Sequence, residues 1–171
     1  IAVTTDDSND EIVYASSMGD GVIQYKNGTP VQSYNEKNAF KETAGGYGSG
    51  YCYIDGLAFD KNGNLWMTSS EVNHAVLVLD KAGAWHRLDI EQLRGVYTIN
   101  DILITSTNDK WIYVPRNTPK LVMIPNSESL DEVSSYEFTT LIDTDGKELT
   151  PSNYTCVAED KDGYILSLIH I

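Results

Sequence analysis

Two stretches of the chain, a hundred residues apart, have nearly the same sequence. Residues 60–66 read DKNGNLW, and residues 160–166 read DKDGYIL. Each stretch follows one apolar run and leads into another. An Asn-Gly or Asp-Gly pair between two such runs is the strongest short signal for a β-hairpin. The chain is therefore predicted to consist of repeated hairpins.

Weaker copies of this pattern occur twice more. Residues 102–114 repeat it with Trp111 in the place of Trp66, and residues 10–15 give a shorter version at the start of the chain. The second strand of a unit is followed by a further β-rich run and then by a more polar fourth run, such as residues 85–88. Four short antiparallel strands in each unit of roughly 40 to 50 residues is the pattern of a β-propeller blade.

The predicted fold is all-β: a β-propeller fragment, residues 1–165, of about three and a half four-stranded antiparallel blades. The blades are expected at approximately residues 1–45, 51–95 and 96–150, with the start of the next at residues 151–165. Residues 166–171 depart from the repeat where a tryptophan is due. They resemble the translated end of a sequencing adapter, so we expect them not to belong to the propeller.

Composition excludes several partners. A chain of 171 residues with 41% hydrophobic residues can bury a core, which argues against disorder. The formal net charge of −13 argues against nucleic acid as a partner, because that affinity depends on Lys and Arg neutralising phosphates. No apolar run reaches the roughly 18 residues that cross a bilayer, so no membrane insertion is expected in this fragment.

Residues 54–66, which read IDGLAFDKNGNLW, resemble the two-component regulator propeller repeats of Bacteroidetes, in which a D-x-x-G-x-[LI]-W core recurs. Residues 150–163 are similar to the run that ends in this core. More narrowly, the order of residues 110–111, 121–124 and 151–163 resembles a PorZ-like propeller component of the type IX secretion system. Lys110 departs from the pattern, which has an apolar residue before the tryptophan.

This resemblance implies a non-catalytic sensing or recognition domain of a periplasmic or cell-surface protein. The preferred interpretation is the ligand-sensing part of a two-component regulator that responds to glycans, with any kinase activity outside the fragment. The alternative is a structural or interaction component of type IX secretion, and a third interpretation is a propeller-fold hydrolase or lyase. The expected partners are an oligosaccharide, other secretion or receptor proteins, and the remaining blades of the same chain.

A ligand would be expected on the propeller face that carries the second-to-third strand connections and the connections between blades. That face would display residues 18–20, 45–51, 70–74 and 115–119. Tyr47 or Tyr51 would stack on a sugar ring, and the side chains expected to form hydrogen bonds are Glu71, Asn73, His74, Arg116 and Asn117. The alternative is that these segments are ordinary solvated loops.

Trp66 and Trp111 are interpreted as packing residues between adjacent blades, because a repeated core requires the same side chain at the same place in every unit.

The three histidines, His74, His86 and His170, do not have the spacing of a metal site. Strands rather than helices are predicted on both sides of the Asp-containing turns, which favours hairpin turns over calcium loops. No catalytic residue, metal or cofactor is expected.

Overall fold

The computed structural model describes residues 1–5, 9–40, 42–43, 50–127 and 129–170. The first blade contains β1 (Ala2–Thr5), β2 (Glu11–Gly19), β3 (Gly21–Lys26) and β4 (Thr29–Tyr34). The second contains β5 (Cys52–Phe59), β6 (Leu65–Ser69), β7 (Val76–Leu79) and β8 (Trp85–Leu88). The third contains β9 (Ile102–Ile104), β10 (Lys110–Val114), β11 (Lys120–Ile124) and β12 (Tyr136–Phe138).

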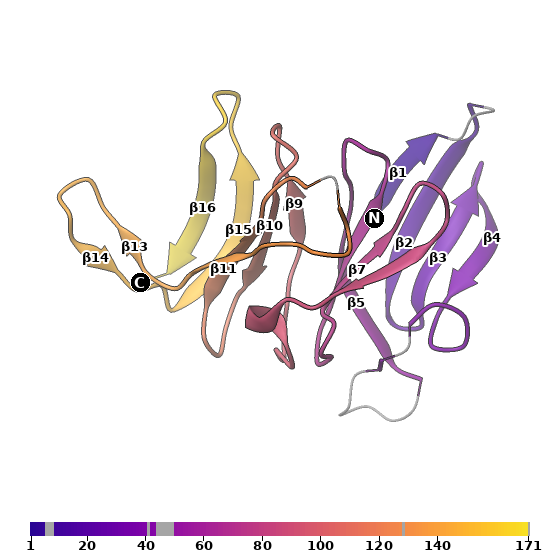
Figure 1. Ribbon diagram of the computed structural model, residues 1–171, viewed down its shortest axis with the longest axis horizontal. Coiled ribbons are helices and arrows are strands. Elements are labelled where there is room, and N and C mark those ends of the chain that lie inside the picture. The colour runs from indigo at the N-terminus through magenta and orange to yellow at the C-terminus, as the bar shows by residue number, and fades with distance from the viewer. Residues whose placement is uncertain (6–8, 41, 44–49, 128, 171) are drawn as a thin grey trace.

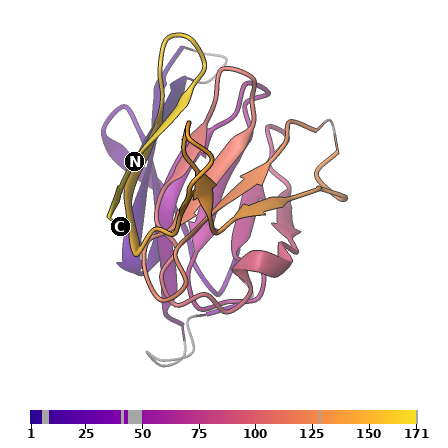
Figure 2. The ribbon, with the colours of Figure 1, turned by 90° about the vertical axis from the view of Figure 1, so that its left-hand side faces the viewer.

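The last unit is a single hairpin of β15 (Asn153–Glu159) and β16 (Ile165–His170). A smaller hairpin, β13 (Leu141–Ile142) and β14 (Glu148–Leu149), precedes it, and the 3₁₀ helix η1 (Glu91–Leu93) connects the second blade to the third. Neighbouring strands within each unit are antiparallel, and the units stand side by side along the molecule (Figures 1 and 2). The prediction of a β-propeller fragment with about three and a half blades is confirmed.

The repeated turns are shaped by an aspartate. In the β5–β6 turn, one oxygen of Asp60 accepts hydrogen bonds of 2.9 Å from the backbone N–H groups of Asn62 and Asn64, and Gly63 has φ +83°. A positive φ is accessible to glycine without steric strain, which explains the Gly at this place. Asp143 and Asp160 accept the same two hydrogen bonds, from the backbone N–H groups two and four residues later in the chain.

The first two blades are joined by backbone pairing, which the repeat pattern did not predict. The end of β2 continues beyond β1 and pairs with the beginning of β5, in the register Met18 with Tyr53 and Gly19 with Cys52. The result is one eight-stranded sheet in the order β4-β3-β2-β5-β6-β7-β8, with β1 beside β2. The second and third blades belong to separate sheets and meet through side chains.

The hydrophobic core lies between the blades. Because successive side chains of a strand point to opposite faces, Leu65 packs toward the first blade while Trp66 packs toward the third, against Ile102 and Ile112. A third cluster, between the third blade and the last hairpin, contains Tyr113, Leu121 and Tyr154, with Trp111 and Phe138 packed against it.

The two tryptophans therefore lie in successive interfaces, although their environments differ. Trp66 is 2% exposed, whereas Trp111 is half-buried and stacks on Phe138 with ring centroids 5.5 Å apart. Lys110, which departs from the repeat pattern, is 1% exposed. Its ammonium group lies 4.6 Å from the centre of the Trp66 ring and donates a 2.7 Å hydrogen bond to the carbonyl of Asn108. A buried cation is thus accommodated by an aromatic face and a carbonyl oxygen.

Residues 165–170 form strand β16, which pairs with β15 and places Ile169 against the third blade. The opposite face of the hairpin exposes Leu166 and Leu168. That residues 166–171 do not belong to the propeller remains a prediction.

Candidate functional site

The molecule has two rims, which carry different connections (Figure 1). We call the rim with the turns at residues 60–64, 80–84, 105–109 and 160–164 the turn face. The opposite rim, the loop face, carries the connections at residues 70–75, 89–101 and 115–119. Most of the candidate residues from the sequence fall on connections of the loop face, but Tyr47 lies outside the described residues.

The remaining candidates are spread over two blades. Glu71, Asn73 and His74 are on the β6–β7 connection, and Tyr51 directly precedes β5. Arg116 and Asn117 are exposed on the β10–β11 connection of the third blade, where Asn117 has a φ of +57°. Tyr51 and the β6–β7 residues thus belong to the second blade, whereas Arg116 and Asn117 belong to the third.

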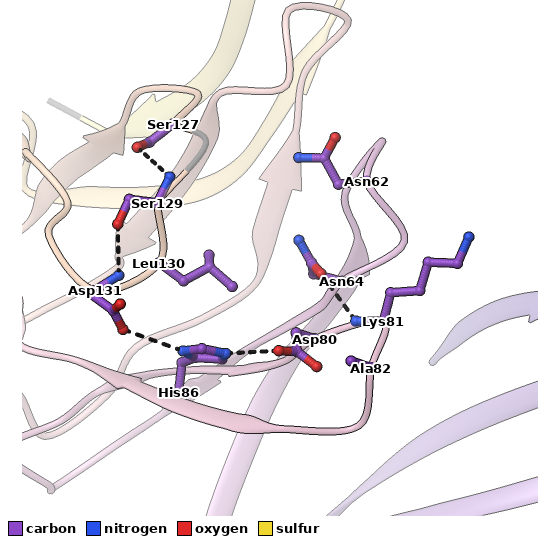
Figure 3. Close-up of a pocket in the computed structure, with 10 residues that line it drawn as sticks. All are labelled: Asn62, Asn64, Asp80, Lys81, Ala82, His86, Ser127, Ser129, Leu130 and Asp131. Carbon is purple, nitrogen blue, oxygen red and sulfur yellow. Dashed lines mark hydrogen bonds and ion pairs between the residues drawn. The ribbon is translucent and has the colours of Figure 1, made fainter.

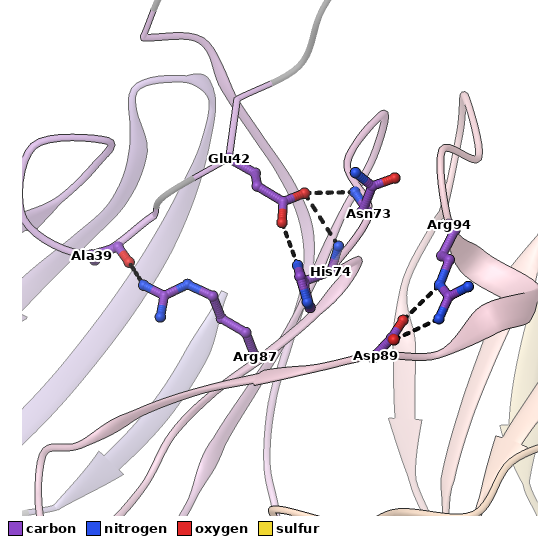
Figure 4. A network of polar contacts seen from close by, with 7 residues as sticks. All are labelled: Ala39, Glu42, Asn73, His74, Arg87, Asp89 and Arg94. Atoms are coloured by element: carbon purple, nitrogen blue, oxygen red, sulfur yellow. Dashed lines mark hydrogen bonds and ion pairs between the residues drawn. The ribbon is translucent and has the colours of Figure 1, made fainter.

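Glu42 holds the β6–β7 connection in place (Figure 4). One of its carboxylate oxygens accepts hydrogen bonds from the backbone N–H groups of Asn73 (2.6 Å) and His74 (3.3 Å), and the other bonds Nδ1 of His74. Partial burial acts to raise the pKa of Glu42, but the bonds from His74 and the two peptide groups outweigh it and hold the pKa below its ordinary value. The imidazole of His74 is therefore already engaged by Glu42.

Two segments of the loop face lie side by side next to this connection. The backbone N–H of Glu71 donates to the carbonyl of Val96 (2.8 Å), and the N–H of Ile99 donates to Oγ of Ser70 (2.8 Å). These bonds place the exposed Tyr97 beside Glu71. The N–H of Ser70 also donates to the carbonyl of Tyr53 (3.1 Å), which links both segments to β5.

A group of tyrosines and carboxylates surrounds this junction. Tyr51 and Tyr53 pack edge to face, with ring centroids 6.4 Å apart and planes at 88°. Oγ of Ser70 donates to Oδ2 of Asp55 at 3.3 Å. We call Tyr51, Tyr53, Tyr97, Asp55 and Glu71 the tyrosine–carboxylate cluster.

The cluster has a negative electrostatic environment. Burial raises the pKa of Asp55 to about 6, and nearby Asp101 adds to the effect, while the bond from Ser70 opposes it. The pKa of the Tyr53 hydroxyl is also raised, first by burial and then by the charges of Asp55 and its neighbours, Glu71 among them. Both shifts mean that further negative charge is disfavoured here.

Glu71 has two unusual features. Its φ is +62°, a conformation that is uncommon for residues other than glycine, and strained backbone of this kind concentrates at functional sites. Its Oε1 is buried and has no hydrogen-bond partner among the described residues. A buried carboxylate oxygen without a partner is energetically costly, so this residue, like its strained backbone, is an exception that calls for an explanation.

A cavity of about 740 Å³ lies on the turn face (Figure 3). Nε2 of His86 is 2.9 Å from Oδ2 of Asp80, and its Nδ1 is 3.8 Å from Oδ1 of Asp131. The cavity is lined by Asn62, Asn64, Asp80, Lys81, Ala82, His86, Ser127, Ser129, Leu130 and Asp131. Its volume is in the range of small-ligand sites.

Sequence reasoning missed Tyr53, Asp55 and Tyr97 of the cluster, and the whole of this cavity. Tyr51 and Tyr53 are two residues apart at the start of a strand, a spacing that puts both side chains on one face and was available as a signal. The strand pattern does not determine the position of irregular connections, which contain Tyr97 and the cavity residues Ser127, Ser129, Leu130 and Asp131. Among the described residues, no group of three or more His, Cys, Asp or Glu is arranged to hold a metal ion.

No protein-family model matches the chain, and no curated protein matches it. Several solved structures are similar to the chain, and two of them, each with 18% sequence identity, illustrate the likeness. One is PorZ, an essential bacterial surface component of the type IX secretion system of Porphyromonas gingivalis, with a TM-score of 0.84 over 97% of this chain. The other is the extracellular domain of the putative hybrid two-component system BT3049 from B. thetaiotaomicron, with a TM-score of 0.61 over 96% of this chain.

The chain spans only part of these neighbours, 23% of the PorZ chain and 20% of the other. The likeness shows the fold, and both neighbours are of the kinds that the repeat motifs indicated. No helix in the described ranges is long and apolar enough to span a bilayer.

Proposed function

We propose that this chain is part of an extracellular, non-catalytic recognition propeller whose loop face binds oligosaccharides. The observation that carries the proposal is the tyrosine–carboxylate cluster. The apolar C–H faces of sugar rings pack on aromatic rings, and sugar hydroxyl groups donate hydrogen bonds to carboxylates. The tyrosines and the carboxylates of the cluster therefore match the two kinds of surface that a sugar presents. Similarity to an extracellular domain and to a bacterial surface component supports the extracellular location.

Within this class, the preferred role is the ligand-sensing part of a two-component regulator that responds to glycans. The cluster favours it, because such a sensor needs a specific polar site on the exposed rim. The second candidate is a surface component of type IX secretion, which the higher TM-score of 0.84 to PorZ favours. DNA sequence on either side of this segment separates the two: a membrane helix and a histidine kinase indicate the sensor, and a secretion-signal domain without a kinase indicates the secretion component.

The binding site itself is tested with a glycan array followed by titration calorimetry on the array's best ligand. Tyr97→Ala is expected to weaken binding about tenfold, which corresponds to about 1.4 kcal/mol. The matched control is Tyr164→Ala, because Tyr164 is similarly exposed but lies in the β15–β16 turn on the opposite rim. An array without a single bound glycan, or equal losses in the two variants, would contradict the proposal.

A further inference from the structure

The outer edge of the second blade is open. Strand β8 ends the eight-stranded sheet, so no strand of the described chain pairs with its outer side. The N–H of Asp80 bonds the carbonyl of Ala84, and hydrogen-bonded pairs alternate along an antiparallel ladder. His86 and Leu88 therefore exchange hydrogen bonds with β7, and the peptide groups of Trp85 and Arg87 point outward. Such an edge is a template for a further strand.

A groove accompanies this edge. The cavity of about 740 Å³ that His86 lines is followed by a second, of about 390 Å³, that Leu88 lines. Asp131 borders both cavities, so they adjoin, and we call the two together the groove; residues 129–134 line its far wall. His86 and Leu88 lie two residues apart in β8, so both face this groove.

The far wall of the groove is fixed in place. Leu130 and Val133 pack against the core between the second and third blades, and Oγ of Ser135 donates a 2.9 Å hydrogen bond to the side chain of Gln92. Before the segment, the N–H of Asn126 donates to Asp109 at 2.8 Å. The wall is thus anchored at both ends and through its middle, and the groove is a built feature of the fold.

The groove is acidic. Four carboxylates line its two cavities, together with one lysine and one histidine: Asp80, Asp89, Asp131, Glu132, Lys81 and His86. Asp80 is engaged by His86, and Asp89 by Arg94. Asp131 and Glu132 are exposed on the far wall, and the side chain of Asp131 is 90% exposed and lies 3.8 Å from His86. Positive groups of a partner would be attracted to these two carboxylates.

We propose that an extended segment of a partner protein adds to the outer edge of β8 as a further strand, with lysine or arginine at alternate positions entering the groove. Main-chain hydrogen bonds to Trp85 and Arg87 supply affinity, and side chains on the groove side supply specificity, as in other cases of strand addition. The period of two follows from the strand, since only every second side chain faces Asp131 and Glu132. This surface is on the outer margin of the blade and is separate from the tyrosine–carboxylate cluster.

The probe is a fluorescein-labelled octapeptide of alternating lysine and threonine, with binding to the full chain followed by fluorescence anisotropy. The lysine peptide is expected to bind, and the same peptide with glutamate for lysine is not. N-methylation of alternate peptide groups removes main-chain donors while keeping the charge, and is expected to weaken binding at least tenfold. Hydrogen exchange at the amides of Trp85 and Arg87 should slow when the lysine peptide is added.

The double variant Asp131→Asn with Glu132→Gln is expected to weaken binding of the lysine peptide at least tenfold. The control is Asp145→Asn with Glu148→Gln, which removes the same charge from the exposed β13–β14 hairpin. Equal binding by the N-methylated peptide would reduce the interaction to a general charge effect and overturn the proposal. So would equal losses in the two double variants, or no binding of the lysine peptide.

Discussion

The indole nitrogen of Trp66 donates a 2.9 Å hydrogen bond to Oδ2 of Asp60, six residues earlier in the chain. The aspartate that shapes the β5–β6 turn therefore also orients the largest side chain of the interface between the second and third blades. The same spacing recurs in the next hairpin, where Nε2 of His86 meets Asp80 at 2.9 Å. In the β5–β6 hairpin, one aspartate thus determines both a turn and a packing contact.

Asp60→Ala is expected to lower the free energy of unfolding by about 2–4 kcal/mol, because it leaves the Trp66 indole and the Asn64 amide without their buried acceptor. Urea unfolding followed by tryptophan fluorescence measures the change. Asp143→Ala is the control: its carboxylate makes equivalent turn bonds in an exposed hairpin and should cost about 1 kcal/mol or less. Similar losses in both variants would show that the bond to Trp66 contributes nothing.

Lys110→Met is expected to unfold at the same urea concentration as the parent chain or a higher one, because the methionine fills the same space without a buried charge. Lys110→Ala should instead lower the free energy of unfolding by about 2–4 kcal/mol, because it leaves a cavity against Trp66.

Burial lowers the pKa of Lys110, although Asp60 and Asp109 act in the opposite direction. A lowered pKa means that the unfolded chain binds more protons up to pH 10.5, so stability from this group rises as the pH rises toward that value.

Comparison of urea midpoints at pH 7 and pH 10.5 tests this assignment, because the window in which the unfolded chain binds more protons ends at the ordinary pKa of 10.5. The urea midpoint of the parent chain should rise relative to that of Lys110→Met between the two pH values. A parallel response of both proteins would mean that the ammonium group is not disfavoured in the fold.

Asp55→Asn is expected to raise the melting temperature at pH 7.5 by about 2–4 °C and to have little effect at pH 3.5. The folded pKa of about 6 exceeds the ordinary value of 3.8, so between these values the folded chain binds more protons than the unfolded one. Stability therefore falls as the pH rises through this window, and the asparagine variant does not experience the loss. Calorimetric melting curves from pH 3.5 to 7.5 provide the measurement, with Asp145→Asn in the exposed β13–β14 hairpin for comparison. A constant difference across the range would exclude Asp55 as the titrating group.

Gly56→Ala is expected to destabilise the contact between the second and third blades by about 1–3 kcal/mol. A methyl group there would lie 2.7 Å from the backbone nitrogen of Ile102 and 2.9 Å from Oγ1 of Thr68, so the third blade would have to shift. Gly83→Asn is a suitable control, because asparagine tolerates a positive φ and that position has open space around it. Chemical denaturation of both variants gives the answer, and equal stability of the two would contradict the close contact.

The sequence was sufficient for the parts of the structure that repeat. Asp60 and Asp160 head the same turn in different units, and an Asp-x-x-Gly turn between apolar runs determines a hairpin locally, before any tertiary contact forms. Trp66 could be assigned to a blade interface for the same reason. The join between β2 and β5 could not, because it depends on how far β2 extends beyond β1, which no local pattern records.

The candidate site was predictable only in part. Tyr51 and Glu71 fall on the loop face because topology sends their segments there. Tyr97 reaches Glu71 through the backbone bond between Glu71 and Val96, a contact between two irregular connections. The role of His74 in ligand binding stays a prediction. Its contact with Glu42 could not be anticipated, because Glu42 lies in the connection between the first two blades, where the strand pattern gives no positional information.

The pairing of β2 with β5 has a consequence for how the chain opens. Blades held by side-chain packing alone can separate one at a time, as in other repeat proteins, where each interface contributes its own term. Here, separation of the first blade from the second must break main-chain hydrogen bonds as well as the packing between them. We therefore expect the first two blades to unfold as a single cooperative unit, and the first separation under force or denaturant to occur beyond Trp66, on the side of the third blade.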